Sequence, residues 1–175
     1  PLFLHQRDAH ADFMKVVKKY KDDIPKAVLH CFTGTQKDLD DYLNMGLYIG
    51  LTGWICDERR NVDLRKSLIN IPVEKLMIET DCPYLIPRNL DDKPKNNRNE
   101  PSYLPHIAKE IASLVNIDVN KFFQDIEKKE TKEKLKLVTD EAFSKKIFGA
   151  PTFFYNNKIY WGQDRLNYVI DEVIK

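Results

Sequence analysis

The stretch AVLHCFTG, residues 27–34, contains a short apolar run that ends directly before His30. Three similar apolar runs occupy residues 2–4, 47–51 and 76–78. Between the first two runs, residues 9–20 carry apolar side chains at spacings of three and four, which is the pattern of an amphipathic helix. Apolar strands that alternate with helical stretches predict successive βα units and a parallel sheet.

The number of these units predicts an incomplete barrel. Four strands with their helices make about half of a (β/α)8 TIM barrel, whose usual length is ~250 residues. Residues 86–101 are polar and rich in proline and asparagine, which predicts a long loop, and a helix is expected at residues 103–115. We therefore predict an α/β fold in which residues 1–117 form a partial TIM barrel of about four βα units.

The composition is that of an ordinary globular protein, with 42% hydrophobic and 31% charged residues in a chain of 175. The net charge of +1 at pH 7 indicates no polyanionic partner, so any nucleic-acid site has to be local. Cys31, Cys56 and Cys82 form no C-x-x-C pair, which favours reduced thiols and a cytoplasmic protein. We expect no membrane span and no signal peptide. Because Pro1 already lies in an expected strand, we expect a piece of a longer chain.

Side chains able to bind metal stand where three of the expected strands end. His5 follows the first strand, His30 the second and Asp81 the fourth. The carboxyl ends of the strands in a βα barrel meet on one face, which carries the active site. Two imidazoles and a carboxylate are suitable ligands for Zn²⁺, Mn²⁺ or Mg²⁺. A single histidine on an apolar strand is usually a packed core residue, but three candidate ligands at equivalent positions predict a divalent metal site.

Longer stretches around these residues carry a family resemblance. They are PLFLHQRDAHADFM, AVLHCFTGT, YIGLTGWICDERR, KLMIETDCPYLIPR and RNEPSYLPHIAKEIA. In this order they resemble the second half of the TatD family of metal-dependent nucleases, over residues 1 to about 116. The resemblance implies a hydrolase of phosphodiester bonds, a deoxyribonuclease, with single-stranded DNA or another nucleic acid as its substrate.

The resemblance also implies roles for individual residues. His5 and His30 would bind metal, and Asp81 would bind metal and act as the catalytic carboxylate that orients or deprotonates the attacking water. Further residues would lie near the substrate phosphate or hold the active-site loops: Arg7, Arg59, Arg88 and the segment Arg98-Asn99-Glu100-Pro101. For each arginine taken alone, a solvated surface charge is the commoner outcome.

The chain departs from the family pattern in one respect. TatD enzymes carry a His-x-His pair on the first strand and a metal-bridging glutamate on a middle strand, and this sequence begins after both. Hydrolysis with two metal ions requires ligands for both ions. The resemblance therefore implies a metal site that is incomplete in the chain as given, with turnover well below that of an intact relative.

The pattern changes after residue 117. A candidate helix, two short candidate strands and a further candidate helix occupy residues 131–147, 152–155, 158–161 and 165–174. The two strands are joined by Asn156-Asn157, which is a hairpin signal. A helix, a hairpin and a helix do not continue a βα barrel, so we predict a second domain over residues 118–175.

This second domain has a resemblance of its own. The stretch IFGAPTFFYNNKIYWGQDRL resembles the end of DsbA-like thioredoxin-fold proteins, especially 2-hydroxychromene-2-carboxylate isomerases and kappa-class glutathione transferases. The resemblance implies a partial thioredoxin-like unit, a cis Ala150–Pro151 bond and four contacts to glutathione or another thiol ligand. The four contacts would come from Ala150, Pro151, Gln163 and Asp164. The alternative is a plain turn followed by a helix cap. The half of that fold with the catalytic serine or cysteine is absent here.

Three functions are candidates. The preferred one is metal-dependent DNA hydrolysis of the TatD type, because its motifs cover about two thirds of the chain and include candidate ligands. The second is a glutathione-dependent isomerase or DsbA-like oxidoreductase module, which has a binding loop but no candidate nucleophile. The third is a catalytically inactive remnant.

Overall fold

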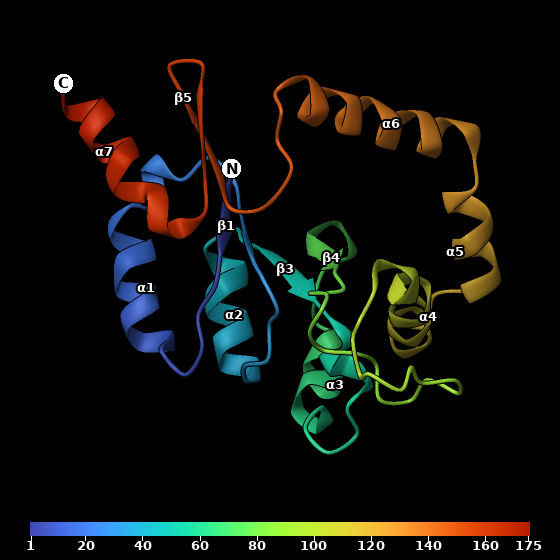
Figure 1. Ribbon diagram of the computed structural model, residues 1–175. Helices are drawn as coiled ribbons and strands as arrows, with labels where there is room; N and C mark the ends of the chain where they lie inside the picture. Colours follow the sequence, from blue (N-terminus) through green and yellow to red (C-terminus); the bar gives the residue numbers. More distant parts are fainter. The chain divides into compact units, whose positions relative to one another are not determined.

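The computed structural model describes residues 1–175, which divide into two compact units, Pro1–Val119 and Asn120–Lys175. In the first unit, short strands alternate with helices, as the sequence predicts (Figure 1). The strands are β1 (Leu2–Leu4), β2 (Ala27–Leu29), β3 (Tyr48–Leu51) and β4 (Leu76–Ile78). The helices are α1 (His10–Lys19), α2 (Gln36–Asn44), α3 (Val62–Leu68) and α4 (Leu104–Leu114), together with a 3-10 turn, η2 (Gly53–Cys56).

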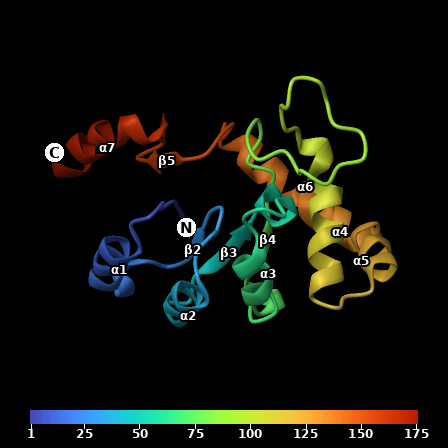
Figure 2. The ribbon, with the colours of Figure 1, turned by 90° about the horizontal axis from the view of Figure 1, so that it is seen from below.

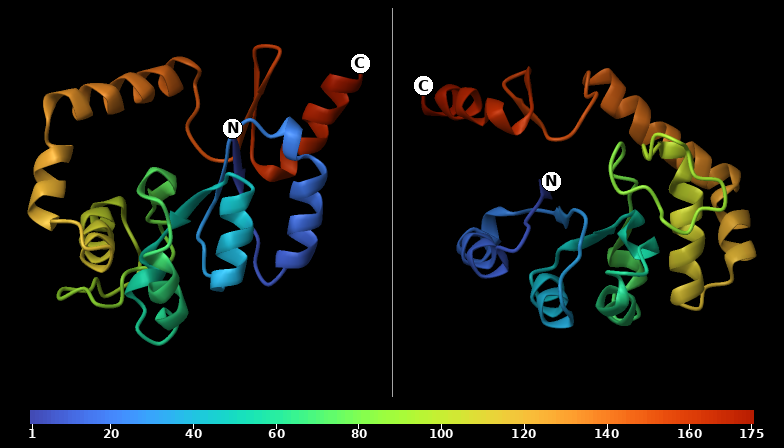
Figure 3. Two further views of the ribbon diagram at one scale, coloured as in Figure 1. Left: turned by 180° about the vertical axis from the view of Figure 1, so that it is seen from behind. Right: turned by 60° about the horizontal axis from the view of Figure 1, so that its bottom comes forward.

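The four strands form one parallel sheet in the order β1-β2-β3-β4. Each strand therefore pairs with the next one along the chain, which is the arrangement of successive βα units. Helices α1, α2 and α3 lie side by side along the sheet (Figures 2 and 3). The outer strands β1 and β4 each have one neighbour, so the sheet is open. The observed α/β arrangement agrees with the predicted partial barrel.

The core of this unit lies between the sheet and its helices. The strand register aligns Leu29, Ile49 and Leu76 on one face of the sheet. Leu29 is 1% exposed and Ile49 0%, because α2 and α3 cover this face with their own apolar side chains. Side chains alternate along a strand, so Phe3 and Met77 lie on the opposite face, where they are 47% and 46% exposed.

Helix α2 begins before its apolar face does. Its first residue is Gln36, whereas its first buried residue is Leu39. The Thr35 hydroxyl accepts a hydrogen bond from the Asp38 backbone N–H, and the Asp38 carboxylate accepts one from the Thr35 N–H. This reciprocal capping box satisfies two backbone donors and starts the helix before its apolar face begins.

The second unit contains helices and one hairpin. Its elements are α5 (Val119–Ile126), α6 (Lys129–Ser144), β5 (Thr152–Tyr155), β6 (Lys158–Trp161) and α7 (Leu166–Ile174). The predicted hairpin is confirmed: β5 and β6 pair antiparallel, and α7 contacts both strands (Figure 1). Asn156 and Asn157 have φ values of 47° and 60°, the backbone conformation that a two-residue hairpin turn requires.

This second unit has no buried core. None of the residues 120–175 is buried, and Phe143 of α6 is 82% exposed. The Ala150–Pro151 peptide bond is cis, as predicted. The thioredoxin-like assignment of this unit stays a prediction. No helix of the chain is both long and apolar enough to cross a membrane.

The burial of Ile49 and the exposure of Ile69 predict different losses of stability when each is replaced by alanine. Replacing Ile49, which is 0% exposed, by alanine should lower the free energy of unfolding by about 2–5 kcal/mol, because the truncation leaves a cavity under α2 and α3. Ile69→Ala, at a position that is 65% exposed, should change it by less than about 0.5 kcal/mol. Urea unfolding followed by circular dichroism measures both, and equal costs would contradict this core.

A candidate metal site beside an arginine pocket

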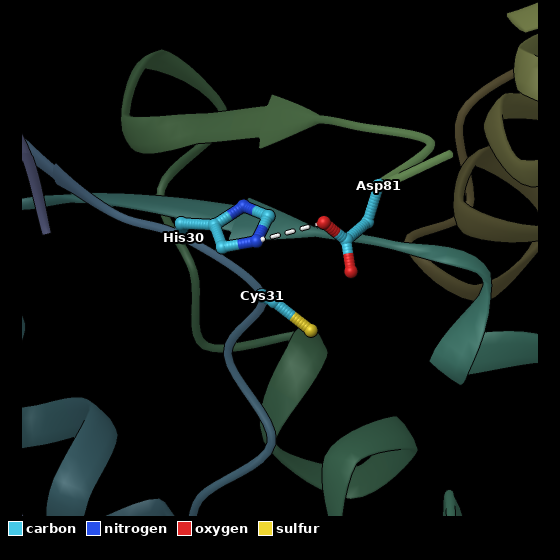
Figure 4. A group of neighbouring side chains, drawn as sticks. All are labelled: His30, Cys31 and Asp81. Atoms are coloured by element: carbon cyan, nitrogen blue, oxygen red, sulfur yellow. Dashed lines mark ion pairs between the residues drawn. The ribbon is translucent and has the colours of Figure 1, made fainter. Parts of the chain in front are cut away.

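His30 lies directly after β2 and contacts two carboxylates from the chain that follows β4. Its Nδ1 is hydrogen-bonded to Glu79. Its Nε2 lies 3.1 Å from Oδ1 of Asp81, as the dashed line in Figure 4 shows. The three side chains are 12%, 16% and 29% exposed, so they are largely shielded from water. The predicted convergence of His30 and Asp81 is therefore observed. Glu79, to which the sequence analysis gave no role, completes the group.

Glu79 determines the state of the imidazole. Its hydrogen bond raises the pKa of His30 above 6.5, against the opposing effect of burial. Because Nδ1 is hydrogen-bonded to Glu79, Nε2 is the nitrogen that gives up its proton when the imidazolium deprotonates, and its lone pair is then available beside Asp81. A histidine that donates one ring N–H to a carboxylate and offers the other nitrogen is the usual arrangement of a metal-binding histidine. Glu79 is thus suited to orient His30 as a ligand.

Gly50 of β3 makes room for this contact. Strand β3 lies between β2 and β4, so the Glu79 side chain has to pass over it to reach His30. A Cβ atom on Gly50 would lie 1.5 Å from Oε1 of Glu79. Any side chain at this position would displace the carboxylate, and the missing side chain of Gly50 is what permits the contact.

Cys31 brings a third donor atom to His30 and Asp81. One nitrogen, one sulfur and one carboxylate oxygen of the three residues lie within 4.8 Å of one another (Figure 4). Two donors that bind one ion at ~2.0–2.3 Å lie up to about 4.6 Å apart, so this spacing fits a shared cation after small movements. Burial raises the pKa of the Cys31 thiol, whose Sγ lies 3.5 Å from the Thr52 hydroxyl. Cys31 is therefore a thiol that Thr52 holds at the edge of the site.

His5 lies beside this group. It follows β1, its ring centroid is 5.7 Å from that of His30, and it is exposed. Its ring is outside the group of donor atoms formed by His30, Cys31 and Asp81. The role of His5 as a metal ligand stays a prediction.

Asn99 holds the loop that carries Asp81. Its side chain is 1% exposed, and its Nδ2 donates to the carbonyl oxygens of Thr80 and Tyr84, at 2.7 Å each. Its backbone N–H donates to the Pro83 carbonyl at 3.1 Å. One buried asparagine thus ties together the chain on both sides of Asp81, which itself adopts a left-handed backbone with φ of 56°.

The four arginines that the family resemblance placed near the phosphate or the active-site loops lie in different parts of the structure. Arg7 and Asp81 line one pocket, of about 440 Å³. Arg59 and Arg88 line a second pocket, of about 380 Å³. Arg98 lines neither of these two pockets.

The four residues predicted to bind glutathione lie in the second unit. The Gly162 N–H donates to the Pro151 carbonyl at 3.0 Å, which brings the Ala150–Pro151 segment beside the start of the segment with Gln163 and Asp164. Ala150, Gln163 and Asp164 are exposed. Ligand binding at these positions stays a prediction.

The Glu79 contact predicts a shift in the titration of His30. Glu79→Gln should lower the pKa of His30, because it replaces the carboxylate, which chiefly raises this pKa, by a neutral amide. In the unmodified chain the raised pKa stabilises the folded state below about pH 6.5, and this contribution is lost as the pH rises through the folded-state pKa. NMR titration of the His30 ring, assigned with His30→Ala, measures the shift. Glu74→Gln is the control, and an unchanged His30 pKa in Glu79→Gln would contradict the contact.

The Asn99 contacts predict a loss of metal affinity. Asn99→Ala should weaken Mn²⁺ binding by about 10- to 100-fold, because partners that orient ligands contribute at this level. Asn61→Ala is a matched control, since buried Asn61 also donates to one backbone carbonyl, that of Ile55, at 2.6 Å. Calorimetric Mn²⁺ titration of both variants makes the comparison. Equal Mn²⁺ affinity in the two variants would show that Asn99 supports only stability.

Comparisons with known proteins identify the family of this chain. The family described as TatD related DNase matches residues 1–138. A protein named 3'-5' ssDNA/RNA exonuclease TatD from Edwardsiella piscicida is 55% identical over 120 residues, which are 69% of this chain and 46% of the relative. The protein of the same name from Citrobacter rodentium is 57% identical over 112 residues, 64% of this chain and 43% of the relative. The chain thus spans less than half the length of these curated relatives.

Solved structures support the same fold. A TatD family hydrolase from Entamoeba histolytica is 30% identical, with a TM-score of 0.60, over 71% of this chain and 47% of that protein. An uncharacterized amidohydrolase from Saccharomyces cerevisiae is 20% identical, with a TM-score of 0.58 over 85% and 53%, and supports the fold alone. The family match runs past the boundary expected at residue 117, and the comparisons give no support to a thioredoxin-like segment. With the family matched over residues 1–138 and His30 and Asp81 brought together after their parallel strands, the chain belongs to the TatD-related DNase family.

Proposed function

We propose that the chain supplies part of the active site of a metal-dependent phosphodiester hydrolase that acts on single-stranded DNA or RNA. The observation that carries the proposal is His30 held between Glu79 and Asp81 at the carboxyl edge of a parallel sheet. This edge is where βα enzymes place their catalytic residues. The names of relatives that are 55% and 57% identical support a nucleic-acid substrate.

In this function, His30 and Asp81 bind a divalent cation, and His5 contributes from β1. A bound cation lowers the pKa of water and neutralises charge on the phosphoryl oxygens. Imidazole and carboxylate donors accept Zn²⁺, Mn²⁺ and Mg²⁺ to different degrees, so all three are candidates. Asp81 is also the group that orients the attacking water and takes up its proton. One of its oxygens can accept a hydrogen bond from the water while the other oxygen is a ligand for the cation.

Arg7 is suited to hold the phosphate that reacts. It lines the same pocket as Asp81, together with Tyr84. A guanidinium group binds phosphate oxygens in a bidentate manner, and an aromatic ring beside it offers a surface on which a base can stack. The pocket therefore combines a candidate metal ligand in Asp81, a guanidinium group for the phosphate in Arg7 and an aromatic ring for the base in Tyr84. These are the groups needed to bind one nucleotide.

Glutathione binding by the second unit is not part of this proposal, because no comparison supports it. An inactive remnant that binds nucleic acid without cleaving it remains the alternative outcome of the experiments below.

Removal of a candidate ligand should weaken metal binding. Asp81→Asn and His30→Ala should each reduce Mn²⁺ affinity of the chain by at least about 10-fold, because each removes a donor atom. Asp63→Asn, which changes an 80% exposed carboxylate on α3, is the charge-matched control. Calorimetric titration measures the affinities, and wild-type affinity in Asp81→Asn would contradict the assignment.

Cleavage of a 3'-labelled oligothymidylate tests the activity itself. Cleavage that requires Mn²⁺, stops in EDTA and is lost in Asp81→Asn supports the nuclease. Binding without cleavage supports the inactive remnant. Cleavage that persists in EDTA would overturn the metal-dependent mechanism.

A further inference from the structure

The pocket that Arg59 and Arg88 line has a third arginine in its wall, Arg60. Among its lining residues, three arginines face a single carboxylate, that of Asp57. The pocket is therefore locally cationic, although the chain as a whole carries a net charge of only +1. Its volume of about 380 Å³ is large enough for a phosphate group with its sugar.

The three arginines are not equivalent. Arg59 is engaged with Asp57 through two hydrogen bonds, Nε to Oδ1 at 2.8 Å and Nη2 to Oδ2 at 2.7 Å. This pair lowers the pKa of Asp57 to about 2, so the carboxylate stays charged and neutralises Arg59. Arg88 makes longer ion pairs, with its Nε 3.5 Å from Oδ1 of Asp57 and 3.6 Å from Oε1 of Glu58, which is 68% exposed. The charge that Arg59 could offer a ligand is thus already used within the protein.

Arg60 keeps its charge available. Its guanidinium lies over the ring of Trp54, 5.4 Å from the centroid, and no carboxylate lies within ion-pair distance of it. A cation held on an aromatic face is positioned without being neutralised. Arg60 is therefore the unpaired cation of the pocket, and Arg88, whose ion pairs are longer than the hydrogen bonds of Arg59, is the second cation able to bind an anion.

The arginine pocket adjoins the pocket that Asp81 lines. Trp54 and Leu85 line both pockets, so they form the shared wall between the arginines and Asp81. Tyr84, which is 70% exposed, lies on the Asp81 side of this wall. Cations that alternate with exposed aromatic rings along a groove are the features by which proteins hold a single nucleic-acid strand.

We propose that this pocket binds a second phosphate of the strand whose reacting phosphate lies at Asp81, with Arg60 and Arg88 as the binding cations and Trp54 between the two sites. The proposal rests on the nuclease function, and it identifies the substrate as a strand with more than one phosphate. Arg59 serves the pocket indirectly, by neutralising Asp57.

Binding of oligonucleotides of two lengths distinguishes the two phosphate sites. Fluorescence anisotropy of the chain with labelled oligothymidylates, in EDTA to prevent cleavage, compares a dinucleotide with one phosphate and an octanucleotide. Arg60→Ala should weaken octanucleotide binding several-fold and leave the dinucleotide unchanged. It should also reduce the slope of log affinity against log salt by ~0.7, the value for one phosphate contact on a single strand. Arg88→Ala should have the same effect.

Lys66→Ala is the matched control, because Lys66 lies on α3 outside both pockets and is 74% exposed. It should leave the octanucleotide affinity and the salt slope unchanged. An Arg60→Ala chain that behaves like Lys66→Ala would overturn the second phosphate site while leaving the nuclease proposal intact. Equal weakening of dinucleotide and octanucleotide would also overturn it, since Arg60 would then contact the reacting phosphate. Failure of the unmodified chain to bind either oligonucleotide would overturn the nuclease proposal as well.

Discussion

The carboxylate of Glu79 lies where a side chain of Gly50 would otherwise be, and the candidate site depends on this replacement. Strand β3 separates His30 from the chain after β4, so the two can meet only across a position without a side chain. The contact occupies Nδ1 of His30, raises the pKa of the imidazole and leaves Nε2 directed at Asp81. Because metal ligands must be held in a narrow range of positions, a carboxylate that orients an imidazole contributes about 10- to 100-fold to metal affinity.

The segment after β4 is the other constraint, since it contributes to both pockets. The Asn99 side chain donates hydrogen bonds to Thr80 and Tyr84, which lie on either side of Asp81 in this segment. The same segment packs closely against η2 at Gly53. A Cβ atom on Gly53 would lie 2.1 Å from the Leu85 carbonyl oxygen, so the glycine permits this approach. Leu85 thereby reaches Trp54 and forms the wall that the two pockets share. An irregular loop of this kind carries function only when buried hydrogen bonds and tight backbone contacts hold it in place.

The two units of the chain differ in how they are stabilised. The first buries a continuous set of apolar side chains between its sheet and helices, whereas none of the residues 120–175 is buried. Local propensity accounts for the hairpin of β5 and β6, with two asparagines in left-handed conformation at the turn. A two-stranded hairpin is only marginally stable by itself, and in the second unit its two strands are contacted by α7.

The sequence by itself determined the strands of the first unit, the hairpin of the second, and the placement of His30 and Asp81 after strands. These features depend on periodicity and on near neighbours in the chain. Only the tertiary structure decided that Glu79 joins His30, that Asn99 holds the Asp81 loop, and that Asp57 neutralises Arg59 while Arg60 stays available. The contacts of Glu79 and Asn99 join residues 15 or more positions apart, which no local pattern encodes. Asp57 and Arg59 are only two positions apart, but the geometry of the turn after η2 decides that they pair. The ability of an arginine to bind an anion also depends on the tertiary structure, because neighbouring carboxylates decide whether its guanidinium group is already paired.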